Sequence, residues 1–341
     1  KLKNNAFSAP VESVIESYSM PGKKEIDPST LMAVFYYVLF GMMLSDAGYG
    51  LLMVIGCGIA LAKFKNMEAG LKKSLKMFLY CGISTVFWGA MFGSFFGDAV
   101  AVIGKTFFNA DVSLPAVWFA PLDDPMRLLL FSFLVGILHL FAGLGAQFYQ
   151  LVRQGLWKVA VFDVVFWYML VGGGVVYLLS MQMFTDMVAL SFTLPAIAGT
   201  IGAAAAGIGA VGIVCTSGRS SKSFGKRFLK GLYGLYGVSG YLSDILSYSR
   251  LLALGLATGV IASVFNQMGA MAGSGPLGAA VFILAFVIGH TLNLGINVLG
   301  AYVHTNRLQF VEFFGKFFEG GGRKFTPFAA RTKYFKITEE K

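Results

Sequence analysis

The segment Tyr241–Ala262, with the sequence YLSDILSYSRLLALGLATGVIA, decides how this chain folds. It is almost wholly apolar and long enough for one crossing of a bilayer, which takes about 20 residues. Arg250 stands in its middle, and the nearest acidic residue, Asp244, lies six positions earlier. Residues six apart do not face each other on a helix, so Asp244 is a poor partner for Arg250. The segment predicts a membrane helix whose permanent charge has no local counter-ion.

The composition of the whole chain agrees with a membrane protein. Of its 341 residues, 56% are hydrophobic and 13% are charged, whereas a soluble domain has about 25% charged residues. The mean hydropathy is +0.71. The formal net charge of +10 comes from basic residues in short segments between apolar runs, which is typical of a membrane orientation signal rather than of nucleic-acid binding. We therefore expect an all-α, polytopic membrane protein in contact with lipid, with no nucleic acid as partner.

Apolar segments predict about eight transmembrane helices, of which the last two are long and tilted. The segments are Leu31–Lys63, Met77–Asp98, Met126–Leu151, Val159–Ser180, Met187–Cys215, Tyr236–Asn266 and Leu277–His304. The first is too long for one crossing, and the turn-like insert Ser45–Gly50 (SDAGYG) divides it into two short ones. The glycine-rich run Gly199–Gly212 predicts a face where helices pack closely.

Charge predicts the sidedness of these helices, because basic segments stay in the cytoplasm. The basic segments are Lys63–Lys76, Arg153–Lys158, Arg219–Lys230 and the C-terminal tail, whereas Asp98–Asp124 is mainly acidic. Keeping the basic N-terminal residues on the same side requires the first apolar segment to cross twice. Both termini are then cytoplasmic.

The chain divides into four predicted parts. Residues 1–30 form an amphipathic run-in from an N-terminal cytoplasmic domain that the sequence does not include, which we expect because the chain begins with Lys rather than Met. Residues 31–235 form a six-helix membrane scaffold, 236–318 a pair of transmembrane helices, and 319–341 a basic cytoplasmic tail.

Arg250 is the first candidate functional residue. It lies about 20 Å from either end of its helix, whereas an arginine side chain reaches only about 6 Å toward the headgroups. An arginine in the middle of a membrane costs about 2.5–3.5 kcal/mol, so it faces protein or water and is functional by default. The alternative is an internal salt bridge to Asp244 or to an acid on another helix.

Polar residues share a face on each of the last two long segments. On the first, Ser243, Ser247, Arg250 and Thr258 have helical spacing; on the second, His290, Asn293, Asn297, His304 and Arg307 do, with Glu312 just off that face. Such faces predict an ion path, or they form interhelical hydrogen bonds, which are common in bundles. Arg307 has the further alternative of lying at the cytoplasmic surface.

Three more charged or titratable residues interrupt apolar runs: Asp46, His139 and Asp163. Asp46, together with Asp98, is a candidate for lining an external vestibule. His139 lies within a predicted span and Asp163 near a cytoplasmic end. Each of these residues either relays an ion or satisfies a neighbour.

Catalytic and metal-binding motifs are missing from the sequence. The three histidines include no pair at metal-ligand spacing, and the three cysteines lie singly in apolar runs. The segment Ile103–Thr106 ends like a phosphate-binding loop, but Ala99 stands where such a loop needs glycine. We expect no metal, no cofactor and no catalytic site in this chain.

Three stretches resemble signatures of one family, the membrane half of subunit a, or subunit I, of V-type rotary ATPases. They are FYYVLFGMMLSDAGYG (Phe35–Gly50), YLSDILSYSRLLALGLA (Tyr241–Ala257) and VHTNRLQFVEFFGKFFEGGGRKFTPF (Val303–Phe328), and they occur in the family's order. Leu252 and Thr258 stand where eukaryotic members have Trp and His. This departure points to a bacterial or archaeal plasma membrane.

The resemblance implies a stator subunit with two offset ion half-channels facing a rotating ring of c-type (proteolipid) subunits. It implies that Arg250 is the essential arginine, that Arg307 is its partner, and that His304 and Glu312 line the path of a proton or sodium ion. Asp244 would take the role of an upstream glutamate that this chain lacks. Peripheral stalk subunits would bind the N-terminal domain.

Two other interpretations remain open from the sequence. A secondary transporter would use Arg250 to bind an anionic substrate at the midplane, although such proteins often carry paired broken helices and only one broken segment is found here. A purely structural membrane anchor would leave both arginines without a purpose.

Overall fold

The computed structural model describes residues 4–23, 25–187, 190, 192–219 and 224–322. Within these ranges the chain is helical, and the one β-type contact is an isolated antiparallel bridge between Met20 and Gly322. The elements in chain order are η1 (Ala9–Val11), α1 (Glu12–Tyr18), α2 (Ser29–Leu44), α3 (Ala47–Lys63), α4 (Ala69–Phe92), α5 (Ala99–Phe107), α6 (Pro125–Arg153), α7 (Trp157–Ala160), η2 (Val161–Val165), α8 (Phe166–Ser180), α9 (Gln182–Met187), α10 (Ala196–Ser217), α11 (Phe224–Tyr236), α12 (Val238–Ser247), α13 (Ser249–Ala270), α14 (Pro276–Arg307), η3 (Leu308–Phe313) and α15 (Phe314–Phe317).

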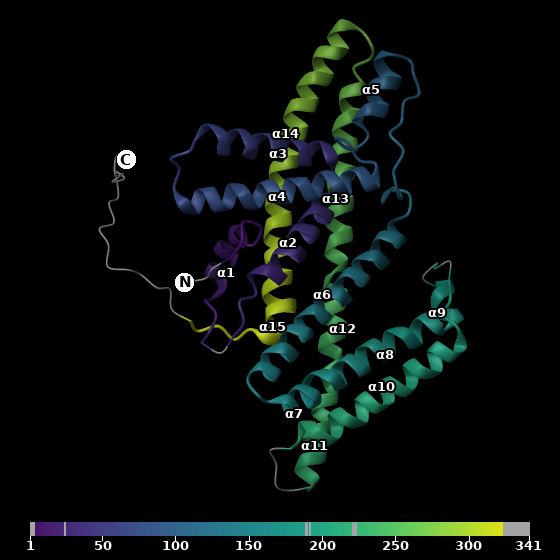
Figure 1. Cartoon of the computed structure of the whole chain (residues 1–341). Coiled ribbons are helices and arrows are strands. Elements are labelled where there is room, and N and C mark those ends of the chain that lie inside the picture. Colours follow the sequence, from purple (N-terminus) through teal and green to yellow (C-terminus); the bar gives the residue numbers. More distant parts are fainter. Residues whose placement is uncertain (1–3, 24, 188–189, 191, 220–223, 323–341) are drawn as a thin grey trace, which may run out of the picture.

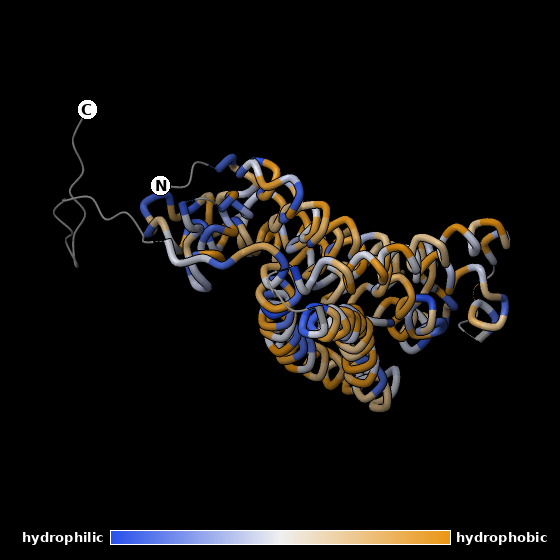
Figure 2. The backbone as a smooth tube through the Cα atoms, turned by 90° about the horizontal axis from the view of Figure 1, so that it is seen from below, coloured by the Kyte–Doolittle hydropathy of each residue, from blue (hydrophilic) through white to orange (hydrophobic). Residues whose placement is uncertain are grey.

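Six helices, or runs of consecutive helices, in the described chain are long and apolar enough to cross a membrane. They are Ala69–Phe92, Pro125–Arg153, Trp157–Ser180, Ala196–Ser217, Gly225–Ala270 and Pro276–Phe317. Figure 2 shows hydrophobic residues along most of these helices. The predicted all-α polytopic membrane fold is confirmed. The count of eight crossings stays a prediction, because α2 and α3 are apolar but shorter than the other six.

The first apolar segment breaks where the sequence predicts. Ser45 has a left-handed backbone conformation with φ 41° and ends α2. Asp46 then caps α3, because its carboxylate accepts a hydrogen bond of 3.1 Å from the backbone N–H of Tyr49. Helices α2 and α3 meet at this corner, and both pack against α4.

The last two runs of helix are much longer than a bilayer is thick. They contain 46 and 42 residues, or about 69 and 63 Å of helix, against a hydrocarbon core of about 30 Å. Figure 1 shows α13 and α14 running side by side and crosswise to the hairpin of α3 and α4. Helices of this length and direction are strongly inclined if the α3–α4 hairpin stands upright in the membrane.

The glycine-rich run forms a close helix contact, as predicted. Helix α10 packs along α8, with Gly199, Gly202 and Gly209 buried. A side chain at Gly202 would approach the backbone oxygen of Gly173 to 2.8 Å, so the two backbones lie too close for any larger residue.

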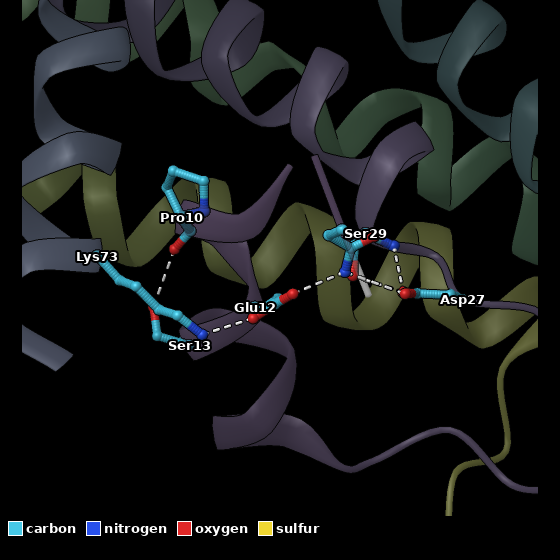
Figure 3. A network of polar contacts seen from close by, with 7 residues as sticks. Pro10, Glu12, Ser13, Asp27, Ser29 and Lys73 are labelled. Atoms are coloured by element: carbon cyan, nitrogen blue, oxygen red, sulfur yellow. Dashed lines mark hydrogen bonds and ion pairs between the residues drawn. The ribbon is translucent and has the colours of Figure 1, made fainter. Parts of the chain in front are cut away.

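The N-terminal segment is tied to the membrane scaffold by polar contacts. Lys73 of α4 forms an ion pair of 2.5 Å with Glu12 of α1, and the Ser29 N–H at the start of α2 donates to Asp27 over 2.9 Å (Figure 3). The bridge from Met20 to Gly322 joins the two ends of the described chain. Most of the predicted basic tail, 323–341, lies outside the described residues.

The basic turns and the segments with few or no basic residues lie on different edges of the molecule. In Figure 1 the turns from α3 to α4 and from α6 to α7 lie on the left and lower edge, together with the end of α10. Helix α5, helix α9 and the turn from α13 to α14 lie on the right and upper edge. The charge asymmetry seen in the sequence therefore corresponds to an asymmetry in space.

Candidate functional site

The two long helix runs bring most of the predicted site residues together. Arg250 lies in the first turn of α13, and Arg307 is the last residue of α14. Glu312 lies one turn further on, within the π-helical segment η3. Arg250 is close enough to interact electrostatically with both Arg307 and Glu312, and His304 with both arginines. We call these four side chains the arginine cluster.

Arg250 has no hydrogen-bond partner within the described chain. Its Nη1 atom is buried and unpaired, and none of the ion pairs between described residues includes it. Glu312 attracts Arg250 without forming an ion pair with it, and its own buried Oε2 atom also has no partner. More than nine in ten buried polar groups in proteins are paired, so these atoms require water, an ion or another chain.

Other unpaired atoms gather near the arginine cluster. Buried atoms without a partner, among the residues that the structure describes, include His304 Nδ1, Asn306 Oδ1, both amide atoms of Gln309 and His139 Nε2. All but His139 lie on the last turn of α14 or on η3. A protein core that leaves this many groups unpaired is a place for hydration or for docking of a partner.

Asp244 does not pair with Arg250, so the internal salt bridge between these two residues, which the sequence left open, is not formed. Its carboxylate forms an ion pair of 2.5 Å with Lys316 of α15, and this ammonium group also lies 4.0 Å from the ring centre of Tyr241. Both partners are mostly buried, at 16% and 22% exposure. Ser247, one turn after Asp244, lies within reach of Glu312 and so borders the arginine cluster.

His139 reaches the same region from α6. It is fully buried, and its Nδ1 atom lies 2.7 Å from the hydroxyl oxygen of Tyr248 in a hydrogen bond. The side chain of Gln309 lies close to His139, although the two form no hydrogen bond of normal geometry. His139 thus has a neighbour, Tyr248, and lies near the arginine cluster. Whether it also relays an ion stays a prediction.

A second polar region runs along α14 toward the opposite end, and we call it the outer track. Asn266 Nδ2 donates to Asp98 over 2.9 Å, and its Oδ1 lies 2.9 Å from His290 Nε2. His290 Nδ1 lies 2.6 Å from the Tyr49 hydroxyl, which in turn accepts from Asn293 over 2.8 Å. The chain is continuous and almost entirely buried.

The outer track begins at a cavity and ends short of the arginine cluster. Asp98 lines a cavity of about 220 Å³ between α5, α13 and the loop before α6. At the other end, Asn297 donates to the backbone oxygen of Asn293 over 2.9 Å. Asn297 is seven residues, or about 11 Å, before His304 on the same helix.

Sequence reasoning missed two members of the outer track. Tyr49 and Asn266 lie in different apolar runs, and each meets residues more than 150 positions away in the chain. The polar face of α14 was the available signal, because His290 and Asn293 were recognised on it. It does not say which other helix supplies their partners.

Asp46 and Asp163 lie apart from the arginine cluster. Asp46 is fully buried and accepts from Ser94 Oγ (2.6 Å), Phe96 N (3.0 Å) and Gly97 N (2.8 Å) as well as capping α3, so it anchors a loop beside the outer track. Asp163 forms a two-pronged ion pair with Arg219 over 2.7 and 2.8 Å. That carboxylate raises the pKa of the exposed Arg219 guanidinium above its usual range.

No metal site is found in the part of the chain that the structure describes. No three His, Cys, Asp or Glu side chains there lie together in a way that could hold an ion, and the cysteines are free. The arginine cluster supplies fixed positive charge and unpaired hydrogen-bonding groups.

Comparison with known proteins gives consistent matches. The model of the V-type ATPase 116kDa subunit family matches residues 238–330. The chain is 32% identical over 346 residues to the A-type ATP synthase subunit I of Pyrococcus horikoshii, covering 100% of this chain and 49% of the relative. It is 34% identical over 348 residues to that of Thermococcus kodakarensis, covering 100% and 49%.

A bacterial relative matches at lower identity. The V-type ATP synthase subunit I of Chlamydia trachomatis is 26% identical over 384 residues, covering 96% of this chain and 55% of the relative. The chain thus spans about half the length of the curated relatives it matches.

Proposed function

This chain belongs to the V-type ATPase 116kDa subunit family, and from that premise we propose that it is the membrane part of the stator of a rotary ATPase. In this role it couples the passage of protons or sodium ions to the rotation of a ring of c-type subunits. It has no catalytic site of its own. Family membership supports the rotary-ATPase role, and the arginine cluster supports the coupling of ion passage to rotation.

The unpaired guanidinium of Arg250 is the observation that carries the proposal. Arg250 is half-buried, its buried Nη1 atom has no partner in the described chain, and Glu312 does not form an ion pair with it, so its charge calls for a further negative partner from outside the chain. A carboxylate on each ring subunit would meet that need as it passes. At about 4 Å and an effective dielectric near 20, two such charges attract by roughly 4 kcal/mol.

That attraction gives each ring carboxylate two states. Opposite Arg250 the carboxylate is held ionised and releases its bound ion. Facing lipid it must be neutral, so it has to carry a proton or a sodium ion. Arginine suits this task better than lysine, because a guanidinium does not lose its proton in a low-dielectric site.

Rotation requires that ions reach the ring from the two sides at different places. The outer track, from Asp98 to Asn293, supports one half-channel, since it is a continuous polar line from a cavity into the membrane region. The unpaired atoms of His304, Gln309 and Glu312 support a second, hydrated one near the other end. Arg250 belongs to the cluster at the second path, where its charge would repel a cation taking a direct path from one half-channel to the other.

The orientation follows from the basic segments under the positive-inside rule. The ends of the helices that carry Lys63–Lys76 and Arg153–Lys158 would be cytoplasmic, and so would both termini. The outer track then opens to the outside of a bacterial or archaeal plasma membrane. The half of the relatives that this chain does not span would hold the binding surface for the peripheral stalk.

A secondary transporter that binds an anion at Arg250 is the rival function. The two are separated by placing the full-length subunit in lipid vesicles with and without its c-type ring and measuring voltage-driven ion flux. If the subunit is a stator, voltage-driven ion flux occurs only when the ring is present, and Arg250→Ala changes this ring-dependent flux. Substrate-dependent flux through the subunit alone would establish the transporter instead.

A further inference from the structure

His139 occupies an unusual position among aromatic rings. Its imidazole lies between Phe35 of α2 and Phe313 of η3, with ring centroids 4.4 Å away on each side and interplanar angles of 28° and 19°. The ring is fully buried. Flat contacts on both faces fix the plane of the imidazole, so its nitrogen atoms point in set directions.

One of those directions leads to Tyr248, where the first long helix run is irregular. Tyr248 separates α12 from α13, and its turn is closed by two short-range bonds, from its N–H to the Ile245 oxygen (3.1 Å) and from the Leu251 N–H to its own oxygen (3.0 Å). This is a 3₁₀-type tightening rather than regular α-helix. Arg250 follows two residues later, so the direction of its side chain depends on this turn.

Helix α6 holds Tyr248 at a second point. A Cβ atom built on Gly136, one turn before His139, would lie 2.6 Å from the Tyr248 ring. The tyrosine ring therefore rests directly on the backbone of α6, while its hydroxyl is bonded to His139. The packing of its ring and the hydrogen bond of its hydroxyl together fix the position of the Tyr248 side chain.

The other contact of His139 leads to the irregular part of the second long run. Phe313 ends the π-helical segment η3, which starts directly after Arg307 and contains Glu312. π-helical turns shift the register of a helix and occur frequently at functional sites. Through Phe313, His139 touches the element that sets the positions of both Arg307 and Glu312.

We propose that His139 is a positioning residue that fixes the placement of Arg250 relative to Arg307 and Glu312 by joining the Tyr248 turn to the η3 segment. This inference rests on the proposed function. It assigns His139 no ion of its own: the hydrogen bond to Tyr248 and the stacking on Phe313 carry the effect. A core residue with only a folding role would not act on the coupling of the assembled machine.

The test uses the intact complex carrying His139→Phe or Tyr248→Phe. The first variant keeps a flat ring between Phe35 and Phe313 but loses the hydrogen bond, and the second removes the same bond from the other side. For each we measure the amount of assembled complex, the rate of ATP hydrolysis, and the number of ions transported per ATP. Loss of one net hydrogen bond changes a conformational ratio by up to about tenfold.

The expected result is normal assembly with a fall of up to about tenfold in ions transported per ATP, and no further fall in the double variant. Ser132→Ala is the matched control, because it removes a buried hydrogen bond, 2.8 Å to the Leu128 oxygen, from the same helix. It should leave the coupling unchanged. Equal losses in Ser132→Ala would overturn the inference, since they would reflect general weakening of α6.

Two further outcomes would also overturn it. One is wild-type coupling in both His139→Phe and Tyr248→Phe; the other is loss of assembled complex in both, which would assign the pair to folding. Arg250→Ala in the same assay separates this inference from the proposed function. If Arg250→Ala abolishes coupling while the two phenylalanine variants do not, only the positioning role fails.

Discussion

Replacing Asn266 by leucine tests whether the hydrogen bonds of the outer track stabilise the folded protein. Asn266 is fully buried and makes three hydrogen bonds, to the Phe96 oxygen (2.8 Å), to Asp98 (2.9 Å) and to His290 (2.9 Å). Leucine has nearly the same volume, so Asn266→Leu removes the bonds without leaving a cavity.

The magnitude follows from which partners water can reach. Asp98 borders the cavity and can be rehydrated, whereas the Phe96 oxygen and the buried His290 ring lose a partner. Two such groups cost about 2–4 kcal/mol, because hydrogen bonds between membrane helices are individually weak. That loss lowers the midpoint of thermal unfolding by roughly 5–10 °C.

The assay is thermal unfolding of the purified subunit in detergent, with Gln267→Leu as control. Gln267 is the next residue on α13 and is exposed, so its substitution removes an amide without breaking a buried bond. Asn266→Leu should unfold well below Gln267→Leu. Equal midpoints would refute the argument, because the outer track would then contribute nothing to the fold.

Three smaller predictions use the same unfolding assay. Gly89→Ala should destabilise the chain severely, because the new Cβ would lie 2.0 Å from the Ala47 backbone nitrogen, whereas Gly174→Ala has open space and should be neutral or stabilise by up to about 1 kcal/mol; similar midpoints would contradict the packing at the α2–α3 corner. Lys316→Met leaves the mostly buried Asp244 carboxylate unpaired and should lower the free energy of unfolding by about 2–4 kcal/mol. Adding Asp244→Leu should restore most of that loss. No recovery in the double variant would show that the unpaired carboxylate is not the cause. Asp163→Asn breaks an exposed ion pair and should cost less than about 1 kcal/mol, with a smaller effect in high salt.

The turn at Ser45–Gly50 shows what can be predicted from the sequence. An acid and two glycines inside a long apolar run indicate a break between two helices. Irregular backbone has unpaired polar groups, which the hydrocarbon core of a membrane does not satisfy, so such a break needs protein or water around it. The position of the break was therefore predictable, whereas the sequence indicates Asp46 as a candidate for lining a vestibule and not as the cap of α3. The glycine-rich packing face of α10 was predictable for a similar reason, since small residues have few other uses there.

The partners of the site residues were not predictable in the same way. The spacing of His290 and Asn293 gives the face of a helix, but it does not give the neighbour that fills that face. Tyr49 and Asn266 became partners through the packing of helices remote in the chain. The pairing of Asp244 with Lys316 has the same origin, and it leaves Arg250 free.

The irregular turns also escaped prediction. Neither the 3₁₀-type turn at Tyr248 nor the π-helical segment Leu308–Phe313 has a sequence signal such as proline. Tertiary contacts are made at both, namely the hydrogen bond between His139 and Tyr248 and the stacking of His139 on Phe313. Local propensity is the same for a regular and an irregular helix of this composition, so only packing decides between them.

The central claim is that Arg250 meets its counter-charge on a neighbouring ring rather than within its own chain. The most direct test is ATP-driven ion uptake by vesicles containing the intact complex with Arg250→Lys or Arg250→Ala, beside the exposed Arg127→Ala as control. The account predicts normal assembly with no coupled uptake in both Arg250 variants and normal uptake in the control. Wild-type uptake in either Arg250 variant would contradict it.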